Sequence, residues 1–164
     1  MEKYLDKPAR YPRREFKHPD PGTTFCRQCN AVHEEKRWRW DSERQFEMSS
    51  DSGIKPITCP ACHMEEQGLY DGQLVIEWPK LARDPKQKEQ ILSLLRHEEA
   101  EEKDANPLSK ICSIKESGSE IEVHTTTEFL VNKLGHALHS AYSGELKIDP
   151  LKYEDFTRVT WSRD

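Results

Sequence analysis

Two short cysteine pairs carry the clearest chemical signal in this chain. They are C-x-x-C turns at Cys26 and Cys29 and at Cys59 and Cys62, with 29 residues between the pairs. Each turn directs two sulfur atoms at one point, so two such turns can form the closed tetrahedral thiolate site of structural zinc. Thiolates are soft ligands that favour zinc over magnesium or calcium. The sequence therefore predicts one structural Zn2+ bound by Cys26, Cys29, Cys59 and Cys62.

Other uses of these cysteines fit the sequence less well. Two disulfides need an oxidising compartment, and no signal-peptide pattern directs the chain to one. A thioredoxin-like redox pair begins a helix after a strand, and we expect neither pair to do so. An iron–sulfur cluster is less favoured because neither pair has a third cysteine nearby. His33 and His63 lie near the pairs and can each replace a cysteine as ligand, but the simpler prediction is two solvated histidines.

The composition favours small folded units over one large core. Apolar and charged residues each make up 34% of the chain, and the mean hydropathy is −0.94. So low a fraction of apolar residues favours a metal-stabilised module beside a small packed domain. No apolar run approaches the roughly 20 residues of a membrane helix. We therefore expect a cytoplasmic protein without membrane contact.

The sequence contains no catalytic signature. It lacks a nucleophile elbow, a P-loop, a dinucleotide fingerprint, the H-E-x-x-H motif and the kinase motifs. His136 and His139, with His124 ahead of them, have no spacing that makes a metal site with nearby carboxylates, and exposed helix histidines are the simpler interpretation. We therefore expect no catalytic residues, no small-molecule substrate and no enzyme activity.

Charge is distributed unevenly along the chain. The net charge of −5 argues against nucleic-acid binding over the whole surface. Residues 1–40, however, carry ten Lys and Arg against six Asp and Glu, whereas the rest of the chain carries fifteen against twenty-four. A basic end on an acidic body predicts one surface for a polyanion and another for water or a basic protein.

Residues 1–22 are predicted to form a flexible basic arm. Four prolines lie in this stretch, and proline blocks helix because it lacks an amide donor. One hypothesis places the arm along RNA, with arginines on phosphates and aromatic rings on bases. An ordinary solvated tail is the equal alternative. The candidate RNA-binding residues, in the arm and in the cysteine region, are Arg10, Arg13, Arg14, Arg27, Arg37 and Arg39.

Residues 23–82 are predicted to form a β-rich zinc ribbon around the cysteine pairs. Within it, residues 37–40 alternate arginine and tryptophan, as in a hairpin strand with the arginines on one face and the tryptophans on the other. Residues 73–78 form a second strand ended by a proline.

A linker helix is predicted over residues 83–107. Asp84 is a suitable N-cap, and Pro85 suits the first helical position. The end of this helix, residues 98–104, is almost entirely acidic. Acidic residues oppose the dipole at a helix C-terminus, so we expect this turn to fray. The alternative is an acidic surface that docks a basic protein partner.

Residues 108–164 are predicted to form a small β-β-α-β-β domain, which makes the fold class α+β. Two strands surround a Ser-Gly-Ser turn, and Thr125 with Glu128 forms a capping box for a helix over residues 129–142. Gly144 is the expected C-cap, and two short strands follow. Cys112 has no partner cysteine and is predicted to be a small buried apolar residue.

The pattern resembles the N-terminal region of an archaeal and eukaryotic family, the large-subunit nuclear-export adaptors named for nonsense-mediated decay, and small uncharacterised bacterial proteins of the same layout. The resemblance is carried by the two cysteine pairs and by residues 37–40, 121–125, 129–142, 144–147 and 158–161. It implies binding to the large ribosomal subunit or its rRNA, with zinc as a structural element. The chain lacks the later β-domains and export tail of the adaptors, so the resemblance does not imply export.

The sequence thus predicts a non-catalytic zinc-ribbon protein that binds the ribosome or structured RNA. The expected roles are in translation, ribosome assembly or hibernation. The alternative is a protein–protein adaptor, in which zinc only stabilises the fold and the acidic helix docks a basic partner.

Overall fold

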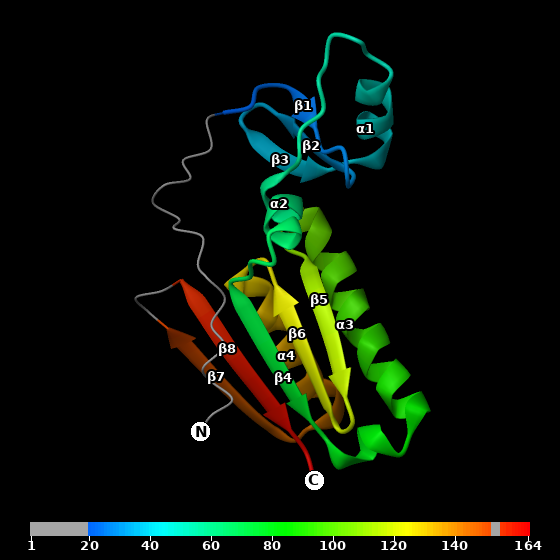
Figure 1. The fold of residues 1–164 in the computed structure, drawn as a ribbon, viewed down its shortest axis with the longest axis vertical. Coiled ribbons are helices and arrows are strands. Elements are labelled where there is room, and N and C mark those ends of the chain that lie inside the picture. The colour runs from blue at the N-terminus through cyan, green and yellow to red at the C-terminus, as the bar shows by residue number, and fades with distance from the viewer. Residues whose placement is uncertain (1–19, 152–154) are drawn as a thin grey trace.

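The structure is a computed structural model that describes residues 20–151 and 155–164. It contains two separate sheets, with strand orders β1-β2-β3 and β5-β6-β4-β8-β7 (Figure 1). The α+β class predicted from the sequence is confirmed. Most of the predicted basic arm, including Arg10, Arg13 and Arg14, lies outside the described residues.

The first sheet belongs to a small unit that we call the cysteine module, residues 20–66. Its elements are β1 (Thr24–Phe25), β2 (Ala31–Glu34), β3 (Arg37–Trp40), α1 (Ser42–Ser49) and α2 (Pro60–Glu66). The hairpin between β2 and β3 turns at Glu35 and Lys36, which have φ of 52° and 65°. Two consecutive residues with positive φ match the twist of a two-residue hairpin. The helices α1 and α2 were not predicted.

The second sheet belongs to a larger unit that we call the sheet module, residues 71–164. Its elements are β4 (Gly72–Glu77), the 3-10 helix η2 (Pro79–Ala82), α3 (Pro85–Ala105), β5 (Ile111–Ser117), β6 (Glu120–Thr125), α4 (Glu128–Tyr142), β7 (Glu145–Leu151) and β8 (Phe156–Ser162). The central strand β4 runs antiparallel to β6 and parallel to β8. Alternate residues of β4, β6 and β8 point into one apolar core, against which α4 and α3 pack.

The predicted boundary between zinc ribbon and linker helix does not match this layout. The strand placed in the zinc ribbon is β4, the central strand of the larger sheet, and its Leu74 and Ile76 are fully buried in the core of the sheet module. The predicted linker helix is α3, and it is part of the same core through its fully buried Ile91 and Leu95.

Several helix ends also differ from the predictions. Asp84 caps α3 as expected, since its side chain accepts from the Gln87 amide. The acidic end of α3 does not fray: the helix continues to Ala105, and buried Glu99 accepts a 2.9 Å hydrogen bond from the Ile111 amide. The helix α4 is capped by Thr127 rather than by Thr125, because Thr125 is the last residue of β6.

The described helices of the chain include none that is both long enough and apolar enough to cross a membrane.

Candidate metal centre

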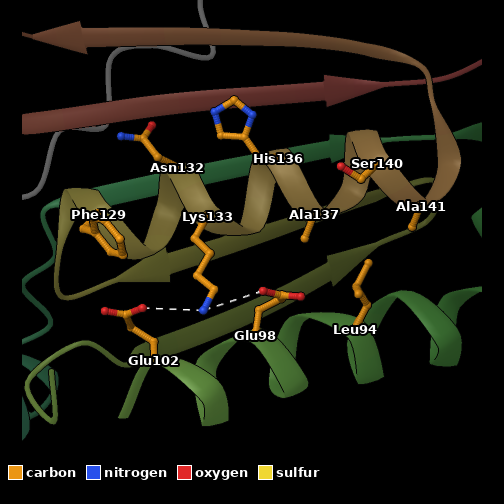
Figure 2. A pocket seen from close by; sticks show the side chains of 10 residues that line it. All are labelled: Leu94, Glu98, Glu102, Phe129, Asn132, Lys133, His136, Ala137, Ser140 and Ala141. Carbon is orange, nitrogen blue, oxygen red and sulfur yellow. Dashed lines mark ion pairs between the residues drawn. The ribbon is translucent and has the colours of Figure 1, made fainter. Parts of the chain in front are cut away.

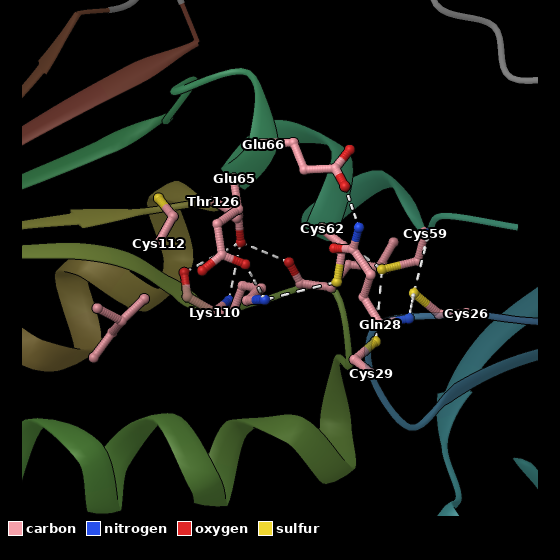
Figure 3. Close-up of polar contacts among 12 residues, drawn as sticks. Cys26, Gln28, Cys29, Cys59, Cys62, Glu65, Glu66, Lys110, Cys112 and Thr126 are labelled. Carbon is pink, nitrogen blue, oxygen red and sulfur yellow. Dashed lines mark hydrogen bonds and ion pairs between the residues drawn. The ribbon is translucent and has the colours of Figure 1, made fainter. Parts of the chain in front are cut away.

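The four predicted cysteines meet in one cluster between the end of β1 and the start of α2 (Figure 3). Cys26 follows β1, and its amide donates to the Ala31 carbonyl, which folds the chain back toward Cys29. The segment before Cys59 runs beside the first pair, because Cys26 and Ile57 form a parallel β-bridge. This bridge brings together two C-x-x-C turns that are 29 residues apart in the sequence.

The cluster geometry fits a tetrahedral metal ion. All four sulfur atoms lie within 4.8 Å of one another, and the Cys29 and Cys59 sulfurs are 3.8 Å apart. A Zn–S length of about 2.3 Å puts tetrahedral sulfurs about 3.8 Å apart, whereas a disulfide bond is only about 2.05 Å long. All five cysteines are free thiols in this structure. The four sulfurs can therefore hold one metal ion, and disulfide pairing does not describe them.

Backbone amides point at the sulfurs, as a thiolate site requires. The amides of Gln28 and Cys59 lie 3.4 and 3.3 Å from the Cys26 sulfur, and the Cys62 amide lies 3.4 Å from the Cys59 sulfur. Each N–H donates toward a sulfur that would carry negative charge, and such outer-shell donors orient and stabilise metal ligands. Three of the cysteines are fully buried, so solvent does not compensate that charge.

The thiols cannot all ionise together without a cation. Hydrogen bonds from Cys29 and Cys59 lower the pKa of Cys26, since its thiolate is the acceptor. The hydrogen bond to Cys26 correspondingly raises the pKa of Cys29 to about 12, and hydrogen bonds to Cys26 and Cys29 raise the pKa of Cys59. A divalent cation at the centre removes this competition, because a coordinating thiol is deprotonated outright.

A lysine of the sheet module reaches the cluster. The Lys110 ammonium, directly before β5, lies 3.7 Å from the Cys62 sulfur and forms an ion pair with Glu65 (Figure 3). Burial opposes its charged form, but the Glu65 and Cys62 partners hold the pKa of Lys110 above its ordinary value. Lys110 therefore places a cation beside a site whose four thiolates and one divalent ion would carry net negative charge.

We expect Lys110→Met to weaken zinc binding by about tenfold, the lower end of the usual effect of an outer-shell change. The change removes the ammonium beside Cys62 while keeping most of the side-chain volume. Competition with a chromogenic chelator measures the affinity. Lys115→Met, an exposed lysine on β5, is the matched control. Equal affinities in both variants would show that the Lys110 contact has no effect on the metal.

The two histidines near the cysteines are not part of the cluster. Within the described residues, the candidate metal group consists of the four cysteines alone. His33 was predicted to be solvated, but it is 4% exposed, and its Nδ1 lies 2.6 Å from the Gly22 carbonyl oxygen. Its ring also meets the edge of Trp38, so His33 packs in the cysteine module.

One reason for rejecting a redox pair was wrong. Cys59 is the N-cap of α2 and Pro60 is its first residue, so the second pair does sit at a helix start. The sequence Cys-Pro-Ala-Cys carried this signal, because proline is common at the first helical position. The two pairs nevertheless converge on each other, an arrangement that a single dithiol redox site does not require.

The candidate RNA-binding arginines of the cysteine module differ in availability. Arg27 and Arg37 are exposed, and the Arg27 guanidinium also donates to the Pro56 carbonyl. Arg39 is held by Glu34 at 2.7 Å and approaches Asp41 at 3.6 Å. The tryptophans of the same strand face elsewhere: Trp38 packs against the cysteine cluster, and Trp40 lies under the Lys103 ammonium at 4.7 Å.

A second polar cluster lies on the sheet module and was not predicted. The Ser113 hydroxyl and the Glu122 carboxylate flank the His124 ring, at 2.8 Å from Nδ1 and 2.5 Å from Nε2. The Tyr70 ring stacks on His124 at 3.7 Å. Burial lowers the pKa of His124, against the opposing effect of Glu122. The alternation of residues in β6 was the available signal, because it puts Glu122 and His124 on one face of the strand. The sequence does not reveal the third member, since Ser113 meets His124 only through the pairing of β5 with β6.

This cluster satisfies buried polar groups of the sheet. Ser113 and His124 are direct cross-strand partners, and Glu122 is two residues from His124 on the same face. Such neighbours on adjacent strands interact as a matter of course, and a buried imidazole requires hydrogen-bond partners.

The remaining predictions for single residues concern Cys112 and two histidines. Cys112 is half-buried rather than fully buried, and burial raises the pKa of its thiol to about 12. His136 and His139 are exposed on α4, as predicted.

Comparisons with protein-family models, with curated proteins and with solved structures find no match to this chain. The resemblance to ribosome-binding adaptors therefore stays a prediction. The site is described by its own geometry, which is a four-cysteine cluster consistent with a zinc-ribbon-like metal centre.

Proposed function

We propose that this is a non-catalytic binding protein whose cysteine module is a zinc ribbon with one structural Zn2+. The observation that carries the proposal is the tetrahedral spacing of four buried or half-buried cysteine sulfurs. Four thiolates fill the coordination sphere of zinc and leave no open position for a substrate or a reactive water. The ion then stabilises the module and positions its surface.

The partner that we propose is the ribosome, contacted through rRNA, or another structured RNA. Arg27 and Arg37 support this, because both are exposed on the module that the metal stabilises. The positive surplus of residues 1–40 lies in the same part of the sequence. Arg39 is a weaker candidate because its guanidinium is already paired with Glu34. A role in translation, ribosome assembly or hibernation follows from such a partner.

The test is co-sedimentation with ribosomal particles on sucrose gradients. Removal of residues 1–18, or Arg27→Ala together with Arg37→Ala, is expected to weaken association and to flatten its salt dependence by up to about one log–log slope unit per lost phosphate contact. Arg83→Ala with Lys86→Ala is the control, because both side chains are exposed on the sheet module. Full association of every variant at all salt concentrations would contradict an RNA contact at these residues.

The second candidate function is a protein–protein adaptor in which zinc is purely structural. The observation that favours it is the acidic end of α3, where Glu98, Glu101 and Glu102 surround Lys133. Replacing Glu101, the exposed glutamate of this run, by lysine is expected to weaken adaptor binding and to leave RNA binding unchanged. This comparison separates the two functions.

A further inference from the structure

The helices α3 and α4 border a groove on the sheet module (Figure 2). Its volume is about 870 Å³, and its lining includes Leu94 and Glu98 of α3 and Phe129, Asn132 and Ala137 of α4. A hollow of this size can take several side chains of a partner.

One rim of the groove is apolar and exposed. Phe129 is 63% exposed at the start of α4, although the neighbouring Leu130 and Val131 are fully buried. Leu94 is half-buried on α3, and the small residues Ala137 and Ala141 leave room over α4. An aromatic ring beside a hollow with small residues is an anchor point for an apolar side chain.

The other rim is acidic and incompletely neutralised. The Lys133 ammonium lies 3.8, 3.9 and 3.5 Å from carboxylate oxygens of Glu98, Glu101 and Glu102, so one cation faces three anions. The Glu98 and Glu102 side chains are only 18% and 9% exposed, which makes their charge costly without further cations. The groove therefore favours a ligand that brings positive charge.

A buried acceptor in the lining also lacks a donor. Within the described residues, the side-chain oxygen of Asn132 is buried and has no hydrogen-bond partner. An unpaired buried polar group costs about 1–3 kcal/mol. Figure 2 shows Asn132 on the side of α4 that faces away from Glu98 and Glu102, so the proposal does not depend on this group.

We propose that this groove docks a basic amphipathic helix of a partner protein. An apolar side chain of that helix lies against Phe129, and its lysines or arginines face Glu98 and Glu102. RNA is disfavoured because its phosphates would meet three carboxylates. A second copy of this chain is disfavoured because a two-fold interface at this groove would bring two acidic rims into one interface without adding a cation. This docking surface is separate from the arginines proposed to contact RNA, so either proposal can fail alone.

The test uses a fluorescent amphipathic peptide of leucine and lysine, about 18 residues or five helical turns long, titrated with the full chain. Phe129→Ser and Glu101→Lys are each expected to weaken binding by about tenfold, since both side chains are more than half exposed and belong to the groove or its acidic rim. Glu89→Lys makes the same charge change at an exposed position on α3 outside the groove, and binding should stay within about twofold of the parent.

Four results would overturn the proposal. The first is absence of peptide binding to the parent chain. The second is equal weakening by Glu89→Lys and Glu101→Lys, which indicates general charge attraction. The third is a dimer, seen by size exclusion, that Phe129→Ser dissociates. The fourth is binding of oligouridine RNA that Phe129→Ser removes. A peptide whose leucines are replaced by serine should bind at least about tenfold more weakly if the apolar anchor contributes as proposed.

Discussion

Cys59→Ala is expected to unfold the cysteine module and to abolish stoichiometric zinc binding. The Cys59 sulfur belongs to the four-cysteine cluster, and it also caps α2 by accepting from the Cys62 amide. In zinc-finger peptides, metal binding supplies about 10–16 kcal/mol of folding free energy. The module has little else to stabilise it, since its second apolar cluster consists of Phe25, Val32, Met48 and the half-buried Ile54. Elemental analysis and amide exchange measure the two effects.

Cys112→Ala is the matched control for this experiment. It removes the one cysteine that lies outside the cluster, so the parent zinc content of one ion per chain should be retained. A preparation of the parent chain without zinc, or with the four clustered cysteines in disulfides, would contradict the metal site itself. Retention of full zinc content by Cys59→Ala would contradict the assignment of this ligand.

The sheet module should remain folded in Cys59→Ala. Its core lies between the five-stranded sheet and the helices α3 and α4, and none of the cysteines of the cluster contributes to that core. Leu108 and Lys110 would lose their partners in the cysteine module, so a modest loss of stability is expected there. Loss of all ordered structure would instead show that the two modules fold as one cooperative unit.

Trp161→Ala is expected to destabilise the sheet module by about 3–5 kcal/mol. Trp161 is fully buried in β8, its ring meets those of Trp78 and Tyr142 at 5.8 and 6.4 Å, and its Nε1 donates a 2.7 Å hydrogen bond to the Ser143 carbonyl. Truncation of a buried tryptophan costs about 3–5 kcal/mol. The loss is a large fraction of the stability of a typical domain, about 5–15 kcal/mol. Urea unfolding followed by circular dichroism measures the change.

Trp40→Ala provides the matched control for Trp161→Ala. Trp40 is half-buried, and its described ring contact is the Lys103 ammonium at 4.7 Å. A cation–π contact of this kind is worth about 0.5–1 kcal/mol, so the sheet module should keep most of its stability. Zinc should stay bound in Trp161→Ala if the cysteine module is independent. Similar losses of sheet-module stability from the two substitutions would show that the Trp161 core is not its main source of stability.

Local patterns in the sequence were sufficient to single out the four clustered cysteines and to predict most element types. Each C-x-x-C turn positions its own two sulfurs, so the spacing was enough to single out the four cysteines. Their meeting at one point depends on the bridge between Cys26 and Ile57. Asp84 followed by Pro85 marks the start of α3 for the same reason, since a cap depends only on its own turn. The alternation of residues 121–125 and the helical period of residues 129–142 likewise identified β6 and most of α4.

Tertiary structure alone decided how these elements combine. The strand β4 joins the larger sheet because β8, more than 80 residues later, pairs with it in parallel, a partner that no local period reveals. The acidic end of α3 is ordered because Lys133 and the Ile111 amide meet its carboxylates. Lys110 approaches the cysteine cluster for the same reason, since the packing of the two modules brings it there. Spacing along a chain determines what a single turn can bind, whereas register and burial depend on segments far apart in the sequence.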